Sequence, residues 1–420
     1  MDKFEKCKNI LKEHNQEHLL DFYDLLSDRK KTMLLNQILR IDLKEICELY
    51  KNSYIEPEKN DVITPLPYID RTKLTEEEID YYYEIGLNSI KNNEFAVITL
   101  AGGQGTRLGH TGPKGTFELK LVHAKKSLFE ILCDNLNIIN NSCHISIPWY
   151  IMTSTNNNKA TIEFFEENNY FNYPNKNIHF FTQNKLPITD VKGKLMLSEL
   201  HVINEASNGN GDVYNSLNEH NIISDLKQKG VKWIFICGID NVLVKPVDPL
   251  FLGLTIKNNY EIASKSIFKE DGEPKNAVFA NRNGHPSILM LNEITEEMNA
   301  SRDPEGNYLY RDTNALCHLY SINALEKCAT LNLPYHRAYK KNTFINEEGM
   351  KQIPESPNSF KFEKFIFDAF DHFDKMLLLR VEKNKEFAPI KDLDGMHEAT
   401  KLYEKRSDEN EDGSNFEKTT

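Results

Sequence analysis

A glycine-rich loop that directly follows a short apolar run sets the tightest limit on how this chain can fold. Residues 96–100 read AVITL, and the loop at 101–116 reads AGGQGTRLGHTGPKGT, with five glycines ahead of Lys114. An ordinary turn needs one or two glycines, which supply backbone conformations that other residues avoid. Five glycines after an apolar strand predict a backbone that lies against a ligand at the carboxyl end of that strand.

The apolar pattern downstream of the loop predicts an α/β fold. Short apolar runs alternate with segments of helical periodicity, which is typical of strand–helix–strand units in a parallel sheet. The apolar runs lie at residues 96–100, 147–153, 178–183 and 231–237, and the helical segments at 128–139, 160–167 and 214–229. The dipeptide Asn283-Gly284 between two further runs predicts an antiparallel hairpin. We therefore expect a Rossmann-like, mixed but mainly parallel sheet flanked by helices.

Three regions are expected along the chain. Residues 1–95 carry leucines at helical spacing, which predicts a helical N-terminal region. Residues 96–395 hold the strand–helix alternation and are expected to form one α/β domain. Residues 396–420 are rich in charge and poor in apolar side chains, so we expect a disordered tail.

Charge and cysteine content exclude several classes of protein. The net charge of −12 and the pI near 5.6 argue against nucleic acid as the main partner. The seven cysteines are scattered and form no C-x-x-C, which favours a reducing compartment and no zinc site. The chain begins without a signal-peptide pattern and has no apolar run long enough for a bilayer. We therefore expect a cytoplasmic protein with no membrane partner.

Two standard phosphate-binding patterns do not fit the loop. A dinucleotide fingerprint needs G-x-G-x-x-G, but the stretch from Gly103 to Gly109 has one residue too many before its last glycine. A P-loop needs a lysine followed by serine or threonine, but Lys114 precedes a glycine. A nucleotidyltransferase loop fits, because its glycines bring backbone N–H groups to a nucleotide while Arg107 and Lys114 bind phosphate oxygens. The alternative is a plain surface connection, which has no use for two cations.

At this loop the sequence resembles the eukaryotic-type UDP-sugar pyrophosphorylases, most of all the UDP-N-acetylhexosamine pyrophosphorylases. The stretch L-A-G-G-Q-G-T-R-L-G followed by P-K-G matches that family's signature. Further matches follow in order at residues 147–154, 180–183, 209–211, 240–241 and 387–391. The resemblance covers about residues 40 to 395 and implies a nucleotidyltransferase-type fold, with 96–395 as the catalytic domain.

The resemblance implies which residues hold the nucleotide and the sugar. Gly102 and Gly103 would contact uracil through backbone groups, and Gln183 would bond its polar edge. Gly209 would also lie against the base. Asn210 and Asn314 would contact the sugar.

The resemblance also implies the catalytic and metal-binding residues. Arg107 and Lys114 would hold the pyrophosphate end of UTP, and Lys391 would neutralise charge across the phosphates. Asp240 would bind Mg²⁺, a hard cation that suits a carboxylate together with phosphate oxygens. Taken alone, Asp240-Asn241 could equally be an ordinary turn at the end of a strand.

The sequence departs from the family pattern at three places. Met290 stands where the N-acetylsugar enzymes have a glutamate that grips sugar hydroxyls, although Glu293 is nearby. The stretch Gly211-Asp212-Val213-Tyr214 resembles the UDP-glucose branch. The sequence given stops soon after Lys391, without the C-terminal β-rich domain of the family, so the oligomeric state is not carried over.

The expected activity is that of a uridylyltransferase. UTP and N-acetylglucosamine 1-phosphate would give UDP-N-acetylglucosamine and pyrophosphate, by in-line attack on the α-phosphorus. One alternative is glucose or galactose 1-phosphate as the sugar substrate, which Met290 and the Gly-Asp-Val-Tyr stretch favour. A second alternative is a protein that binds UDP-sugars without turnover. A dinucleotide-dependent oxidoreductase is disfavoured by the glycine spacing.

Overall fold

The chain forms two compact units in the computed structural model, which describes residues 2–52, 61–270 and 277–411. The small unit combines Met1–Asn60, Asn184–Asp212 and Asn332–Ile366, and the large unit combines Asp61–Gln183, Val213–Leu331 and Phe367–Thr420. These units are discontinuous in sequence, unlike the contiguous regions that we expected. The small unit is held together by pairing of residues 359–360 with 189–190 and by packing of the N-terminal helices against Leu195, Leu197 and Ile203, and local sequence patterns do not reveal such contacts.

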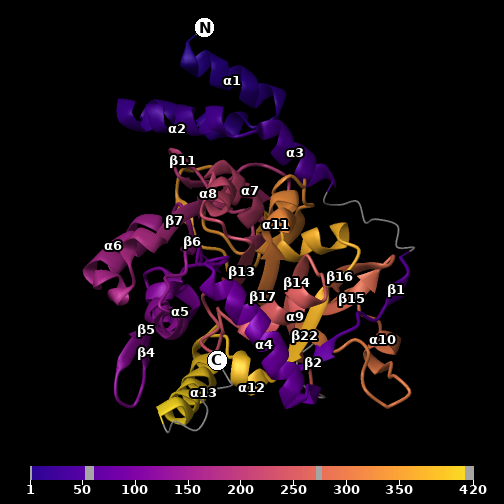
Figure 1. Ribbon diagram of the computed structural model, residues 1–420. Coiled ribbons are helices and arrows are strands. Elements are labelled where there is room, and N and C mark those ends of the chain that lie inside the picture. The colour runs from indigo at the N-terminus through magenta and orange to yellow at the C-terminus, as the bar shows by residue number, and fades with distance from the viewer. Residues whose placement is uncertain (1, 53–60, 271–276, 412–420) are drawn as a thin grey trace. The chain divides into compact units, whose positions relative to one another are not determined.

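An eleven-stranded sheet forms the centre of the large unit (Figure 1). The strand β17 (Asp312–Ser321) is antiparallel to both of its neighbours, and every other pair along the main path is parallel. In spatial order the main path is β2 (Ile69–Asp70), β22 (Leu377–Val381), β14 (Ile262–Phe268), β17, β13 (Trp233–Gly238), β3 (Phe95–Leu100), β6 (Trp149–Ser154) and β7 (Ile178–Gln183). The expected mixed, mainly parallel sheet is confirmed.

The predicted hairpin is present beside this path. It joins β15 (Val278–Arg282) to β16 (His285–Leu289), and β1 (Ile63–Thr64) pairs with β15. The turn residues Asn283 and Gly284 both have positive φ angles, 53° and 87°, as a two-residue hairpin turn requires.

The strands β3 and β6 lie at the centre of the parallel part of the sheet and are its most deeply buried strands. Every residue of β3 and of β6 is buried. Two helices in the large unit pack very closely, since a Cβ atom at Gly86 would lie 1.9 Å from the Pro249 carbonyl oxygen. The helices of this unit are α4 (Glu76–Lys91), α5 (Leu128–Cys143), α6 (Asn158–Glu167), α7 (Val213–Glu219), α8 (Ile222–Gln228), α9 (Pro249–Lys257), α10 (Glu296–Ala300), α11 (Ile322–Ala329), α12 (Lys383–Glu386) and α13 (Leu393–Glu411). A short hairpin pairs β4 (Glu118–Lys120) with β5 (Lys125–Ser127).

The small unit packs three N-terminal helices against short hairpins. Leucines and isoleucines of the helices bury against Leu195, Leu197 and Ile203. The helices are α1 (Lys3–Glu13), α2 (Asp28–Arg40) and α3 (Leu43–Asn52). The strands are β8 (Lys185–Pro187) with β12 (Glu205–Ser207), β10 (Leu197–Glu199) with β11 (Val202–Ile203), β19 (Phe344–Ile345) with β20 (Lys351–Gln352), and the sheet of β18 (His336–Lys340), β21 (Ser359–Glu363) and β9 (Thr189–Asp190).

The C-terminal residues differ from the expected disordered tail. Leu393–Glu411 form α13, while residues 412–420 lie outside the described part of the chain. Ala399 and Tyr403 of this helix bury against the core of the large unit, and Arg406 donates to the carbonyl oxygens of Val242 and Leu243. These few contacts give the helix a packed face despite its charged composition.

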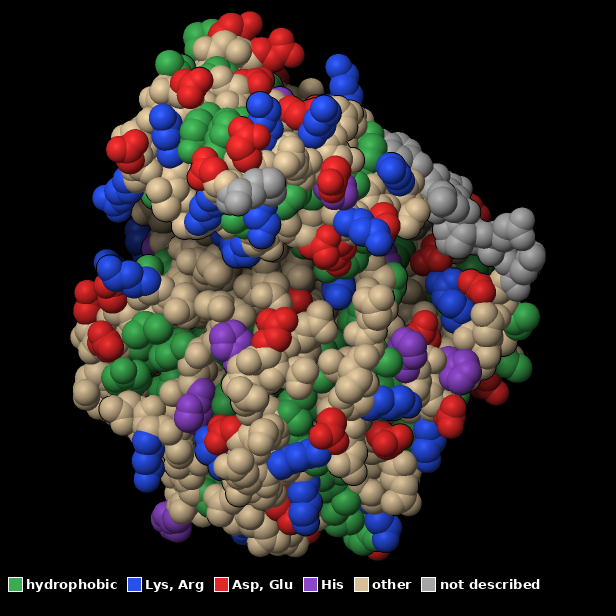
Figure 2. Space-filling view, turned by 90° about the horizontal axis from the view of Figure 1, so that it is seen from above, with side chains coloured by type: hydrophobic (Ala, Val, Ile, Leu, Met, Phe, Trp, Pro, Cys, Tyr) green, Lys and Arg blue, Asp and Glu red, His purple; other side chains and the backbone are tan. Residues whose placement is uncertain are grey.

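The charged side chains on the surface and the state of the cysteines can be compared with the sequence composition. On the face drawn in Figure 2, basic and acidic side chains are interspersed. All seven cysteines lie within the described residues and are free thiols. Among the described helices, none combines the length and the apolar character needed to cross a membrane.

Candidate active site

The carboxyl ends of the central parallel strands bring several predicted residues together. In the strand pairings, Gly238 of β13 lies opposite Leu100 of β3, and Leu100 lies opposite Met152 of β6. The glycine-rich loop leaves β3 at this edge, and the residues after β13 leave it beside that loop. Gln183 ends β7 at the same edge. Ligands of open α/β sheets bind at this edge.

Backbone hydrogen bonds within the glycine-rich loop, and one buried asparagine, fix the conformation of this loop. The Lys114 N–H donates to the Gly103 carbonyl (3.0 Å), and the Gly105 N–H donates to the Gly112 carbonyl (3.1 Å). Asn157, which is 1% exposed, donates its amide to the carbonyls of Ala101 (2.9 Å) and Gly103 (3.2 Å). Sequence reasoning missed Asn157, although an asparagine three residues after the strand-end Ser154 is a signal for a local cap.

Gly102 and Gln183 lie against each other, as the predicted uracil site requires. A Cβ atom at Gly102 would lie 1.9 Å from Gln183 Nε2, so only glycine leaves room for that amide. Apart from its chain neighbours, no atom of the described residues would lie within 4 Å of a Cβ atom at Gly103. The surrounding protein therefore leaves room for a side chain at Gly103. Close approach of a ligand to the backbone would instead require glycine here.

Lys114 and Asp240 converge from the two loops. The Lys114 ammonium lies 3.3 Å from Asp240 Oδ2, and the side chains are 16% and 27% exposed. Asp240 folds back over β13, because a Cβ atom at Gly238 would lie 2.9 Å from Asp240 Oδ1. The pair presents one cation and one hard oxygen donor at the edge of the sheet.

The segment that carries Lys391 is fastened to the same turn. The Ile390 N–H donates to the Asp240 carbonyl (2.8 Å), and the Ala388 N–H donates to the Asn241 side-chain oxygen (2.8 Å). Lys391 follows directly and is exposed. Sequence reasoning placed Asn241 in the metal-bearing turn but did not foresee that its side chain joins two segments.

Arg107 and Asn314 lie near this edge in different settings. Arg107 is exposed in the short 3-10 turn Thr106–Leu108, and no hydrogen bond or ion pair joins it to another residue of the described chain. Asn314 lies early in β17, which runs antiparallel to β13 and so begins at the carboxyl edge. Its side-chain oxygen accepts from the Leu316 N–H (2.7 Å) and stabilises a bulge.

Gly209 and Asn210 belong to the small unit, and each is held by contacts within that unit. Gly209 has a φ of 97°, and a Cβ atom there would lie 2.2 Å from the Lys364 carbonyl oxygen. Asn210 accepts a hydrogen bond from the Ile366 N–H through its side-chain oxygen (3.0 Å). Both residues therefore have local structural roles within their own unit.

Glu293, three residues after Met290, is held by contacts within the protein. One of its carboxylate oxygens accepts from the Met290 N–H (2.8 Å), and the other binds Arg282 (2.8 Å). Each carboxylate oxygen of Glu293 thus already has one partner within the protein.

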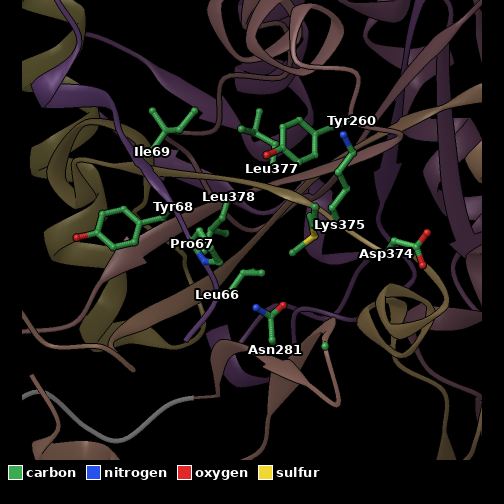
Figure 3. Close-up of a pocket in the computed structure, with 12 residues that line it drawn as sticks. Leu66, Pro67, Tyr68, Ile69, Tyr260, Asn281, Asp374, Lys375, Leu377 and Leu378 are labelled. Carbon is green, nitrogen blue, oxygen red and sulfur yellow. The ribbon is translucent and has the colours of Figure 1, made fainter. Parts of the chain in front are cut away.

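A separate pocket of about 270 Å³ lies at the opposite edge of the sheet (Figure 3). Its lining includes Tyr260, just before β14, and Lys375, just before β22, with the Lys375 ammonium 4.8 Å from the Tyr260 ring centre. These strands run parallel to β13, so the pocket lies at their amino ends. It includes none of the ten predicted site residues.

Comparisons with known proteins agree on one family. The family described as "UTP--glucose-1-phosphate uridylyltransferase" matches residues 45–414. The "UDP-N-acetylglucosamine pyrophosphorylase" of Saccharomyces cerevisiae is 34% identical over 402 residues, which cover 92% of this chain and 82% of that protein. The "Probable UDP-N-acetylglucosamine pyrophosphorylase" of Dictyostelium discoideum is 32% identical over 414 residues, which cover 94% of this chain and 85% of that protein. The crystal structure of the Trypanosoma brucei UDP-N-acetylglucosamine pyrophosphorylase with an inhibitor has a TM-score of 0.78 at 25% identity, covering 96% and 84%.

Proposed function

This chain belongs to the UTP–glucose-1-phosphate uridylyltransferase family, and we propose that it forms UDP-N-acetylglucosamine and pyrophosphate from UTP and N-acetylglucosamine 1-phosphate. The observation that carries the proposal is the meeting of Lys114, Asp240 and the Lys391 segment at one edge of the sheet. The names of the relatives favour the N-acetylated sugar. UTP, the sugar 1-phosphate, the UDP-sugar and pyrophosphate are the expected partners.

The chemistry needs charge neutralisation and alignment and no side-chain nucleophile. An oxygen of the sugar 1-phosphate attacks the α-phosphorus of UTP, its bond to phosphorus forms, and the bond to the pyrophosphate oxygen breaks. Both reactants are anions, so Lys114 and Arg107 would hold the departing pyrophosphate, and Lys391 would lie across the phosphates. The exposed position of Arg107 and Lys391 leaves both side chains accessible to a substrate.

Gly102 and Gln183 would hold the uracil. The contact between them supports this role, because a backbone without a side chain and an adjacent amide can bond neighbouring polar atoms of one base. Gly103 would contribute a second bare stretch of backbone. Gly209 is proposed to contact the base, and Asn210 and Asn314 the sugar, on the strength of the resemblance alone.

Asp240 is the residue that would hold Mg²⁺. A single aspartate suits Mg²⁺, because proteins commonly bind this cation through one or two carboxylates together with substrate phosphates. The carboxylate already faces a cation, since Lys114 lies 3.3 Å away. When bound, Mg²⁺ would neutralise phosphate charge and help to align the two reactants.

The sugar preference has a specific rival. Glucose or galactose 1-phosphate is favoured by Met290 and by the engagement of both Glu293 oxygens within the protein. A second rival is UDP-sugar binding without turnover, which would not need Lys114, Asp240 or Lys391. We also propose a cytoplasmic location, which the seven free thiols support.

The test is pyrophosphate release from UTP with Mg²⁺ against a panel of sugar 1-phosphates. The panel holds the 1-phosphates of N-acetylglucosamine, N-acetylgalactosamine, glucose and galactose. The proposal predicts the highest kcat/KM for N-acetylglucosamine 1-phosphate. A preference for glucose or galactose would replace the sugar assignment, and no release from any of the four would refute the proposed reaction.

A further inference from the structure

Five charged side chains form a buried cluster in the large unit, and none of them belongs to the proposed site. The Lys265 ammonium, 2% exposed, binds Asp248 (2.6 Å) and Glu386 (2.5 Å). Arg71 bridges the same two carboxylates at 2.9 and 3.3 Å, and Lys245 lies 3.8 Å from Glu386. We call these residues the buried charge cluster.

Such a cluster is costly to bury, so stability alone does not explain its presence. Ion pairs taken out of water recover their desolvation penalty only when the geometry is good, and apolar replacements often serve stability equally well. Burial on its own raises the pKa of Glu386, but Lys265, Lys245 and Arg71 outweigh it and lower that pKa. Glu386 therefore stays ionised and fixed between cations.

The Glu386 backbone connects the cluster to the proposed phosphate site. The Glu386 carbonyl accepts from the Asn241 side-chain amide (2.8 Å), and the Asn241 oxygen accepts from the Ala388 N–H (2.8 Å). Two residues further on, the Ile390 N–H donates to the Asp240 carbonyl (2.8 Å). The Glu386 side chain thus anchors the segment 386–391 at one end, and the turn at Asp240 and Asn241 holds the backbone of this segment along its length.

We propose that Glu386 is a positioning residue for the phosphate site, fixing Lys391 relative to Asp240 through the 386–391 segment. The inference rests on the proposed function and deepens it. Glu386 touches no substrate in this account. It acts through the backbone that it anchors.

Asp248 offers a matched comparison inside the same cluster. Its carboxylate binds the same Lys265 and Arg71, and it is as buried as Glu386. Its second task is different, because it accepts from the Phe251 N–H and caps α9. Removing either carboxylate takes one negative charge from the cluster, but hydrogen bonds connect the Glu386 backbone to the Lys391 segment and the Asp248 side chain to α9.

The experiment compares Glu386→Gln with Asp248→Asn in the full chain. An amide at 386 can accept from Lys265 on one side only, and its NH₂ group then faces Arg71 and Lys245, so the side chain must move. We expect both variants to lower the melting temperature. We expect Glu386→Gln to lower kcat by about tenfold or more, since small misplacements of reacting groups cost this much. Asp248→Asn should keep kcat within about twofold of the wild type.

A double variant separates positioning from general loosening of the fold. In a Lys391→Ala background, Glu386→Gln should change kcat by less than about twofold, because the residue that it positions is gone. The inference would be overturned if the two substitutions lowered kcat independently, so that their fold-changes multiplied in the double variant. It would also be overturned if folded Glu386→Gln had an unchanged kcat. If Glu386→Gln does not fold, Asn241→Ala cuts the same link from the other side, with the same expected and overturning results. An inactive wild type would refute the proposed function, and this inference with it, whereas an active wild type with unaffected variants would refute this inference alone.

Discussion

Replacing Gly102 by alanine tests the uracil site, because the structure predicts a large loss of binding with little loss of stability. The new Cβ atom would lie 1.9 Å from Gln183 Nε2, whereas an ordinary contact is about 3.5 Å. The Gln183 amide must therefore retreat by roughly 1.5 Å. It is the far end of a flexible side chain, so the backbone need not move.

The substitution should change the free energy of unfolding much less than it changes nucleotide binding. Displacing the Gln183 rotamer costs about 1 kcal/mol, and replacing glycine by alanine returns about 0.4–1 kcal/mol by restricting the unfolded chain. The free energy of unfolding should therefore change by less than about 1 kcal/mol. A hydrogen bond lost to the uracil edge costs about 1–3 kcal/mol, which weakens nucleotide binding roughly 5- to 150-fold.

Calorimetric titration with UTP and urea unfolding measure the two quantities on the same variant. Gln183→Ala should weaken binding to a similar extent, and the double variant should be no weaker than the weaker single variant. A Gly102→Ala protein that is stable and binds UTP like the wild type would refute the placement of uracil against Gly102 and Gln183.

Three further predictions concern the phosphate site and the buried charge cluster. Lys114→Ala should lower kcat by about 100-fold while the melting temperature stays within a few degrees, and normal turnover would remove its catalytic role. Asp240→Ala should abolish the rise of activity with Mg²⁺ concentration, and an unchanged Mg²⁺ titration would remove its metal role. In Asp248, burial raises the pKa but Lys265 and Arg71 outweigh it, so the folded pKa is lowered and the carboxylate stabilises the fold above its unfolded pKa of about 3.9. The stability gap between wild type and Asp248→Asn should therefore shrink as the pH falls below about 4 in urea unfolding, and a constant gap would contradict the ion pairing.

The core of the candidate site could be predicted because its residues follow strands in the sequence. The loop with Gly102 and Lys114 follows β3, and Asp240 follows β13, so parallel pairing alone brings them to one edge. Gln183 ends β7 at that edge for the same reason. Periodicity and glycine chemistry carry this much information locally.

The supporting residues could not be predicted, because their roles depend on pairing across long distances. Lys265 and Glu386 are 121 positions apart, and in the sequence each is an ordinary charged residue. The small unit likewise draws residues 184–212 and 332–366 onto the N-terminal helices. The prediction of a tail at α13 was wrong because its docking depends on a few scattered residues, among them Ala399, Tyr403 and Arg406, in a segment of charged composition.

Phosphorus NMR of one reaction mixture follows both substrates and both products of the proposed reaction at once. The wild-type chain is incubated with UTP, N-acetylglucosamine 1-phosphate and Mg²⁺, and the phosphorus resonances are followed over time. We expect equal amounts of UDP-N-acetylglucosamine and pyrophosphate to form as both substrates disappear. With Lys114→Ala, we expect the substrate resonances to remain almost unchanged over the same time. Unchanged substrates in the presence of folded wild-type protein would contradict the proposed reaction.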